Sequence, residues 1–204
     1  MRRRLALAVG SALVCVGSLQ AGAPPVQDGD VVFHTSRSRQ SLAIQRATGS
    51  RYSHMGLVFV RDGRPYVFEA VATVRYTPYE QWVQRGEGAH VAVKRLKDAR
   101  TTLNVAALAR LRRAAARYEG RPYDLTFEWS DERIYCSELV WKMFHEALSL
   151  DVGALQKLSE FDLTDPVVKA KIEERYHGRP PLGETVISPQ AMFDSPLLET
   201  QAER

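Results

Sequence analysis

The sequence predicts an α+β protein in which a small, mostly antiparallel sheet packs against helices. Short apolar runs bounded by turn residues fill the first half of the chain, and helical spacing of apolar residues dominates the second half. The length of 204 residues, with 45% hydrophobic and 25% charged residues, suits one ordinary globular domain with its own core. We therefore expect a single domain over residues 24–204, after a separate segment at residues 1–23.

The first 23 residues have the pattern of a secretory signal peptide. Three arginines at positions 2–4 precede an uncharged apolar run at residues 5–19, and the small residues Ala21-Gly22-Ala23 follow. We expect cleavage after Ala23 and export to the periplasm or the exterior. Because the run is shorter than the ~20 residues that a spanning helix needs, no stable membrane span is expected after cleavage, and an uncleaved signal anchor is the alternative.

Removal of this segment changes both the charge and the cysteine count. The chain has a net charge of +4, of which the three arginines supply three, so the mature domain is nearly neutral. Its charge therefore does not favour a nucleic-acid partner. Cleavage also removes Cys15 and leaves Cys136 as the one cysteine. Such a cysteine is either a buried apolar residue or a reactive thiol.

The expected elements begin with a strand and a helix. Asp28-Gly29-Asp30 predicts a turn that leads into a strand at Val31-Val32-Phe33, and a short helix is expected over residues 36–48. Two β-rich runs, residues 54–60 and 65–71, then flank an Asp-Gly pair, which is a strong signal for a hairpin with a two-residue loop.

Further elements follow the hairpin. Strands are expected at residues 74–76 and 90–93, and helices at residues 101–118 and 166–176. Between these helices, a helical pattern after Tyr135 runs from Leu139 through Leu148. The tail beyond them is broken by prolines, and no element is assigned to it.

Cys136 stands at, or just before, the first turn of its expected helix, because apolar spacing begins at Leu139. Unpaired backbone N–H groups and the positive end of the helix dipole lie at such a position, and both favour a thiolate. The same N–H groups can hold an oxyanion. The position therefore suits a nucleophile, although an ordinary cysteine at a helix start is the alternative.

A nucleophilic cysteine needs a base, and His54 is the candidate. It stands at the mouth of the hairpin, whose second strand carries Glu69 as its one acid. A two-residue loop places His54 opposite Val71, so that Glu69 projects from the same face at a diagonal distance of about 7–8 Å between backbones. A carboxylate there can orient and stabilise the imidazole. Taken alone, a half-buried strand histidine and a solvated acid are the simpler interpretations.

Five short blocks resemble, in this order, the permuted papain-like amidases of the YaeF/YiiX type, within the wider NlpC-type cysteine peptidase superfamily. The blocks are Gly29-Asp30-Val31-Val32-Phe33, Tyr52-Ser53-His54-Met55-Gly56, Phe68-Glu69-Ala70, Gly120-x-Pro122-Tyr123-Asp124 and Tyr135-Cys136-Ser137-Glu138-Leu139-Val140. The resemblance covers residues 28–150 and extends to the Ser188-Pro189 region.

The resemblance implies a circularly permuted papain-like fold with Cys136, His54 and Glu69 as a catalytic triad. It further implies that the face bearing His54 and Glu69 meets the start of the Cys136 helix. The expected reaction is hydrolysis of an amide, or an ester, through a thioester acyl-enzyme. The Cys136 N–H is expected to hold the oxyanion, with Tyr135 or Tyr123 as a further donor or substrate contact, and Tyr123 is equally interpreted as a packing residue.

Alternatives from other classes stay open. The same fold can serve a lipid or peptide acyltransferase, or a binding module of the cell envelope without catalysis. A metal site at His34 and His54 matches no familiar ligand spacing, so we expect no metal and no cofactor. Arg37 and Arg39 either line a cleft or, more simply, are solvated. The expected partner is a small-molecule, peptide or lipid-linked acyl substrate, and the oligomeric state is left open.

Overall fold

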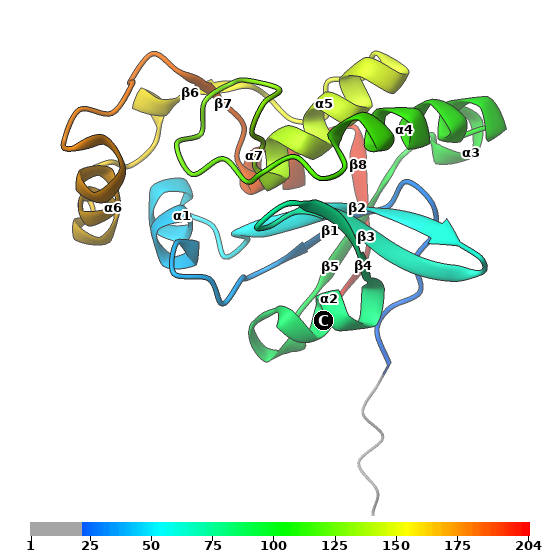
Figure 1. Ribbon diagram of the computed structural model, residues 1–204. Coiled ribbons are helices and arrows are strands. Elements are labelled where there is room, and N and C mark those ends of the chain that lie inside the picture. Colours follow the sequence, from blue (N-terminus) through cyan, green and yellow to red (C-terminus); the bar gives the residue numbers. More distant parts are fainter. Residues whose placement is uncertain (1–21) are drawn as a thin grey trace, which may run out of the picture.

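The structure, a computed structural model, describes residues 22–204, so the predicted signal segment lies outside the described residues except for Gly22 and Ala23. The main sheet has six antiparallel strands in the order β4-β3-β2-β1-β5-β8 (Figure 1). These strands are β1 (Val31–His34), β2 (His54–Arg61), β3 (Arg64–Ala70), β4 (Val74–Pro78), β5 (Ala92–Leu96) and β8 (Leu198–Glu203). A second sheet pairs β6 (Gln156–Lys157) with β7 (Thr185–Val186).

The helices are α1 (Ser41–Thr48), α2 (Tyr79–Arg85), α3 (Ala99–Thr102), α4 (Val105–Tyr118), α5 (Cys136–Leu148), α6 (Pro166–Tyr176) and α7 (Pro189–Phe193), with short 3-10 turns η1 (Glu87–Ala89) and η2 (Leu158–Glu160). The predicted α+β class with an antiparallel sheet is therefore confirmed. Among residues 22–204, none of these helices combines the length and apolarity that crossing a bilayer requires.

Helices cover both faces of the main sheet (Figure 1). Alternate residues of a strand point to opposite faces, so Phe33 and Leu57 join the larger core, which they share with residues of α4 and α5. Val32 and Val58 join a smaller core with residues of α2. This arrangement places α5 on one side of the sheet and α2 on the other.

The hairpin between β2 and β3 has the predicted loop and register. Asp62 and Gly63 have φ angles of 50° and 72°, and a type I′ turn requires positive φ at both central positions. Val60 pairs with Pro65, as expected for a two-residue loop. The register that relates His54 to Glu69 is thus set by local turn geometry.

Two predicted helices have different limits in the structure. The helix expected over residues 101–118 is divided into α3 and α4, because Asn104 adopts extended backbone and caps the first turn of α4 with its side chain. The helix expected over residues 36–48 begins only at Ser41, because Ser36 is held in an isolated β-bridge. The helix at residues 166–176 has the predicted bounds, and α5, expected from the pattern Leu139 to Leu148, begins at Cys136.

The start of α5 is fixed by the segment that precedes α7. The Ser137 hydroxyl donates to the Ile187 carbonyl at 2.7 Å, and the Ile187 N–H donates to the Tyr135 hydroxyl at 3.1 Å. Ser188 then caps α7 by accepting a hydrogen bond from Ala191 N. The polypeptide around Ile187 therefore lies directly against the first turn of α5.

Candidate active site

Cys136 is the first residue of α5 and its side chain is almost fully buried, with 3% exposure. Tyr135, the preceding residue, has extended backbone angles, and Leu139 N is the first amide that bonds back into the helix, to Tyr135 O at 3.0 Å. The first N–H groups of a helix have no partner within it. The sulfur of Cys136 thus lies beside backbone donors at the positive end of the helix dipole.

His54, the first residue of β2, contacts both other predicted site residues. Its Nε2 lies 2.6 Å from Glu69 Oε2, and the Cys136 side chain is near enough to raise the pKa of the imidazole. The structure therefore brings Cys136, His54 and Glu69 together.

Glu69 is fully buried, and three side chains besides His54 hold its carboxylate. Thr77 Oγ1 donates to Oε1 at 2.6 Å and Trp82 Nε1 donates to Oε2 at 2.9 Å. Arg85 Nη2 lies 2.6 and 2.5 Å from the two oxygens. Hydrogen bonds of this number keep a buried carboxylate ionised and fix its orientation.

The charges of the site follow from these contacts. Burial by itself lowers the pKa of His54, but hydrogen bonds with Cys136 and Glu69, and the charges of both, outweigh it and raise the pKa to about 9. Burial likewise opposes ionisation of Glu69, yet the hydrogen bond and charge of His54 and the charge of Arg85 lower its pKa to about 2. At neutral pH His54 is therefore an imidazolium between a carboxylate and the Cys136 sulfur.

The resemblance implies that the face bearing His54 and Glu69 meets the start of α5, and His54 does lie beside Cys136. Around Glu69, however, the same face is covered by α2, which supplies Trp82 and Arg85. Helix α5 packs against the opposite side, in the larger core. His54 joins the two sides because it is the first residue of its strand, so its ring lies at the end of the sheet.

The partners of Glu69 on α2 were missed by the sequence prediction, although the sequence contains a signal for them. Tyr79, Trp82 and Val83 are spaced as one face of a short helix, and all three are buried. Arg85 follows Trp82 by three residues, so the two side chains are neighbours on the helix surface. A segment of seven residues is too short for this spacing to predict a helix, because Gly86 and Gly88 follow it directly.

Replacing Trp82 with Phe is expected to lower kcat/KM about tenfold, because a hydrogen bond to a buried carboxylate is lost while an aromatic ring remains in the core. The measurement is hydrolysis of 4-nitrophenyl butyrate. The half-buried Trp129, which packs edge-to-face against Trp141 away from Glu69, provides the matched control Trp129→Phe. Equal rates for the two variants would contradict a role of Trp82 in holding Glu69.

His34 lies beside the site but is not charged. Its ring stacks on Trp82 with centroids 4.0 Å apart, and burial, with the nearby charges of His54 and Arg85, lowers its pKa to about 2. Nε2 of His54 is already engaged by Glu69. Within residues 22–204, no three His, Cys, Asp or Glu side chains are grouped so that they could hold a metal ion. The donor set therefore does not suit a metal at His34 and His54.

The two predicted tyrosines differ in what their hydroxyl groups do. Tyr135 is 2% exposed, and its hydroxyl accepts the Ile187 N–H. The Tyr123 hydroxyl accepts a hydrogen bond from Gln40 Nε2 at 2.7 Å, which leaves its own proton available. Burial, the main cause, raises the pKa of Tyr123, and the charge of Cys136 adds to it, so this hydroxyl stays protonated near the sulfur.

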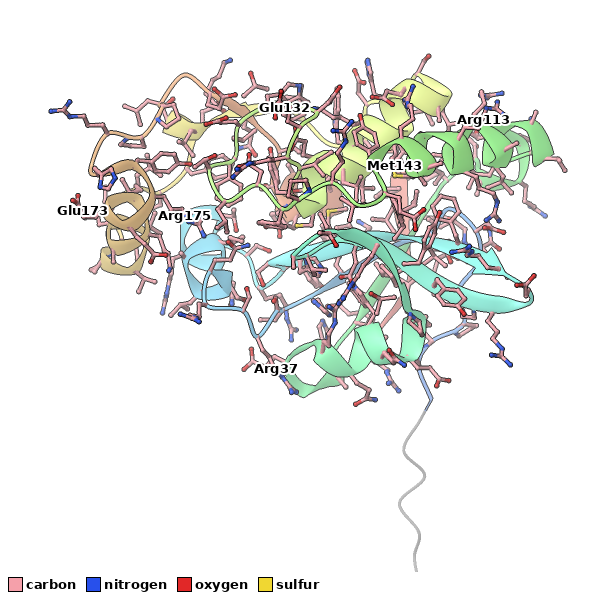
Figure 2. The ribbon with its side chains drawn as sticks, viewed as in Figure 1. Arg37, Arg113, Glu132, Met143, Glu173 and Arg175 are labelled. Carbon is pink, nitrogen blue, oxygen red and sulfur yellow. The ribbon has the colours of Figure 1, made fainter. Side chains whose placement is uncertain are left out.

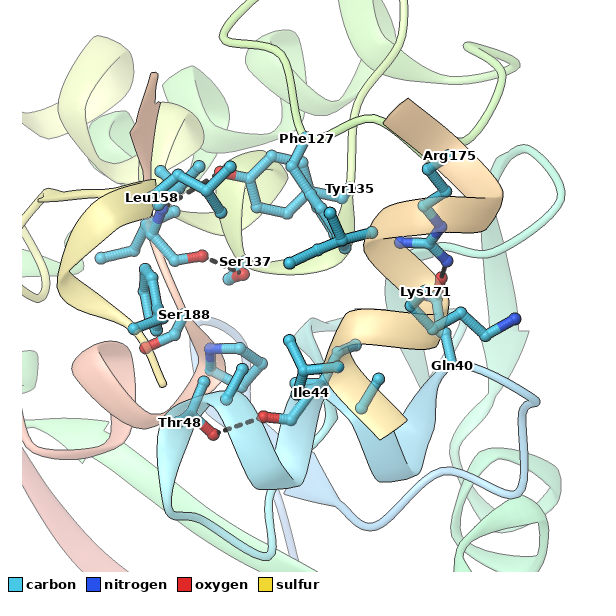
Figure 3. Close-up of a pocket in the computed structure, with 18 of the residues that line it drawn as sticks. Gln40, Ile44, Thr48, Phe127, Tyr135, Ser137, Leu158, Lys171, Arg175 and Ser188 are labelled. Atoms are coloured by element: carbon cyan, nitrogen blue, oxygen red, sulfur yellow. Dashed lines mark hydrogen bonds between the residues drawn. The ribbon is translucent and has the colours of Figure 1, made fainter. Parts of the chain in front are cut away.

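A cavity of about 120 Å³ opens beside Cys136 (Figure 3). Its walls come from α1, from α6 and from segments before and after α6, and their side chains are mostly apolar. They include Ala43, Ile44, Phe127, Leu158, Val168 and Ile172. The thiol therefore faces a small apolar chamber.

A second, wider cleft lies beside His54. Besides His54, its charged lining residues are five bases and one acid, namely Arg37, Arg39, Arg85, Lys171, Arg175 and Glu174. Arg37 and Arg39 are exposed, as expected for solvated side chains, and they also line this cleft. Gln40, Tyr123, Lys171 and Arg175 line both spaces, so the two meet at the site.

The fold and the site define a class. A helix that begins with cysteine packs on an antiparallel sheet, and the sheet carries a histidine and its carboxylate partner. Papain-like cysteine hydrolases have this arrangement. In this chain the histidine precedes the cysteine. The order of the elements is therefore permuted.

The chain belongs to the family described as "Permuted papain-like amidase enzyme, YaeF/YiiX, C92 family", whose model matches residues 25–201. It is 50% identical over 186 residues to the uncharacterized protein YiiX of Escherichia coli strain K12, and the match covers 91% of each chain. A crystal structure described as metalloprotein yiiX from Escherichia coli O157:H7 is similar, with a TM-score of 0.83 and 52% identity over 87% of this chain and 97% of that one. The resemblance found in the sequence is thus confirmed.

Proposed function

We propose that the protein is an exported cysteine hydrolase that cleaves an amide bond, or an ester bond, through a Cys136-His54-Glu69 triad. The observation that carries the proposal is the arrangement in which buried Glu69 holds His54 at 2.6 Å while the Cys136 side chain lies beside the imidazole and raises its pKa. Export rests on the signal-peptide pattern of residues 1–23. Membership of an amidase family supports the reaction class.

The proposed reaction has two halves. The Cys136 sulfur attacks the substrate carbonyl carbon, and the C–N or C–O bond breaks as the leaving group takes a proton from the His54 imidazolium. The product of this half is a thioester on Cys136. Water then attacks the thioester while His54 accepts its proton, and the carboxylic acid leaves with Cys136 restored. Glu69 stabilises the imidazolium whenever it forms.

An oxyanion forms in both halves and needs donors. The Cys136 N–H, free at the start of α5, is one. The Tyr123 hydroxyl is the second, because it is protonated and its proton is not used by Gln40. Tyr135 is the weaker candidate, since its hydroxyl already binds the Ile187 N–H and fixes the segment around it.

No step of the proposed mechanism uses a metal ion. The similar crystal structure is described as a metalloprotein, whereas the described part of this chain offers no group of three or more suitable ligands. The proposed chemistry is complete with the side chains named above.

The test is the rate at which iodoacetamide labels Cys136 at different pH values, followed by peptide mass spectrometry so that Cys15 is counted separately. We expect fast labelling to persist at pH 6, because the His54 imidazolium, whose pKa is about 9, stabilises a neighbouring thiolate. In His54→Ala, labelling is expected to fall about tenfold for each pH unit below about 8.5, as for a free thiol.

His145→Ala is the matched control, because His145 lies on the same helix as Cys136 but is exposed and pairs with Asp151. It should label like the unmodified protein at every pH. If His54→Ala and the unmodified protein have the same pH profile, the proposed activation of Cys136 is wrong.

A further inference from the structure

His34, which the proposed mechanism does not use, is built into the wall of the site. It is the last residue of β1 and pairs directly with His54, the first residue of β2. The ring centroids of the two histidines are 5.2 Å apart, and the His34 ring also stacks on Trp82, with centroids 4.0 Å apart. Gly86 makes room for this ring, because a Cβ at position 86 would lie 3.0 Å from His34 Nδ1. The packing around His34 therefore fixes its ring beside His54.

The polar atoms of His34 have no partner in the part of the chain that the structure describes. The residue is 1% exposed, its Nδ1 is fully enclosed without a hydrogen bond, and none of residues 22–204 forms a hydrogen bond with its Nε2. Burying an imidazole in this way costs free energy that an apolar ring would not cost. Buried polar groups without a protein partner commonly bind an ordered water or have a chemical role.

The cleft beside His54 gives water access to His34. Both histidines line this cleft, and Nε2 is the nitrogen of His34 that the cleft can reach, because Nδ1 is enclosed. The volume of the cleft is about 1090 Å³, which is enough for many water molecules. Arg37, from the segment before α1, and Arg175 of α6 also line it (Figure 2). Water in the cleft therefore has access to both histidines.

His34 can orient a water molecule but cannot act as its base. Burial, the main cause, and the charges of His54 and Arg85 keep the pKa of His34 near 2, so the ring is uncharged. A neutral imidazole has one N–H donor and one acceptor nitrogen, and in either tautomer Nε2 forms a hydrogen bond with water. Because so weak a base does not take up a proton at neutral pH, removal of the proton is left to His54.

We propose that His34 is a further catalytic residue, whose Nε2 holds the water that hydrolyses the thioester on Cys136. The inference rests on the proposed function and concerns its second half. His54 is neutral at this stage, because it has given its proton to the leaving group. The water oxygen bonds to the thioester carbon while one of its protons passes to His54. The C–S bond then breaks, which releases the carboxylic acid and leaves the Cys136 thiolate beside the His54 imidazolium.

The test measures the two halves of the reaction separately, with the full chain and 4-nitrophenyl butyrate. Release of 4-nitrophenolate at low substrate concentration gives kcat/KM, which reports acylation. Rapid acid quenching and mass spectrometry give the rate at which the butyryl group leaves the Cys136 peptide. In His34→Phe we expect this rate to fall about tenfold, because the hydrogen bond that places the water is lost. The value of kcat/KM should stay within about threefold, since acylation consumes no water.

His34→Gln is the matched conservative variant, because its side-chain amide offers a donor and an acceptor in place of the imidazole nitrogen. It should keep the rate of butyryl loss within about threefold of the unmodified protein. His145→Gln is the control outside the site, because His145 is exposed and pairs with Asp151, and it should change neither rate. The urea midpoint of unfolding checks that each variant is folded. If His34→Phe is unfolded, the smaller apolar variant His34→Leu takes its place.

The possible failures are distinguishable. An unchanged rate of butyryl loss in the apolar variant would overturn the inference, and so would an equal fall in both halves of the reaction, which is the effect of packing alone. If His34→Gln is as slow as the apolar variant, the hydrogen bond has no role and the inference is again wrong. The hydrolase stands in each of these cases. If no butyryl group forms on Cys136 of the unmodified protein, the proposed function itself fails.

Discussion

Replacing Cys136 with Ala is expected to lower kcat/KM for 4-nitrophenyl butyrate by about 10⁴-fold or more, because a nucleophile that acts as part of a unit cannot be replaced by its partners. The substitution removes one buried sulfur atom at the first position of α5, where Ala is also well accepted by a helix. Folding should therefore be little affected, and the loss of activity is interpreted as a loss of chemistry.

The urea midpoint of unfolding provides the control for this variant, since it should stay close to that of the unmodified protein. The exposed Ser149, which follows α5 directly, is no part of the site and allows a neutral comparison as Ser149→Gly, a residue type that suits its left-handed backbone. Retention of more than about one tenth of the ester hydrolysis in Cys136→Ala would show that another residue is the nucleophile.

Replacing Glu69 with Gln is expected to have the second largest effect. The amide has one acceptor oxygen where the carboxylate has two, and its NH₂ group would face the donors of Thr77, Trp82 and Arg85. We expect kcat to fall by about 10³- to 10⁴-fold because His54 loses the group that orients it and stabilises its charge. The free energy of unfolding should fall by about 1–3 kcal/mol, since buried donors lose their acceptor.

Two readouts separate positioning from general loss of stability. If Glu69 positions His54, kcat falls much more than KM rises, and iodoacetamide labelling of Cys136 at pH 6 slows together with kcat. Glu80→Gln is the matched control, because Glu80 is an exposed acid on the neighbouring helix α2. Lower stability of Glu69→Gln with kcat within about threefold of the unmodified protein would contradict the positioning role.

Local physics explains which parts of the fold were predictable. The Asp62-Gly63 turn fixes the hairpin register, and Asp165 with Pro166 fixes the start of α6 through a side-chain cap and a proline at the first turn. Strand β8 was missed because it is a mostly exposed edge strand with the polar sequence Leu-Glu-Thr-Gln-Ala-Glu. Its pairing with β5 depends on packing over a long sequence separation, which no local pattern encodes.

The same contrast applies to the site. The period of two along a strand was sufficient to place His54 and Glu69 on one face, and the structure has them in contact. The docking of α2, which surrounds Glu69 with Trp82 and Arg85, is a tertiary contact and could not be read from spacing. The cavity at Cys136 is likewise built from segments that lie more than one hundred residues apart, from Ile44 to Ile172. The grouping of Cys136, His54 and Glu69 was therefore easier to predict than its surroundings.

The central claim is that Cys136, held by His54 and Glu69, forms an acyl-enzyme. The most direct measurement is acid quenching of the full chain during hydrolysis of 4-nitrophenyl butyrate, followed by proteolysis and mass spectrometry. The account predicts a butyryl group on the peptide that contains Cys136, removable by hydroxylamine as a thioester and greatly reduced in His54→Ala. An unmodified Cys136 during steady hydrolysis, or a butyryl group on another residue, would contradict it.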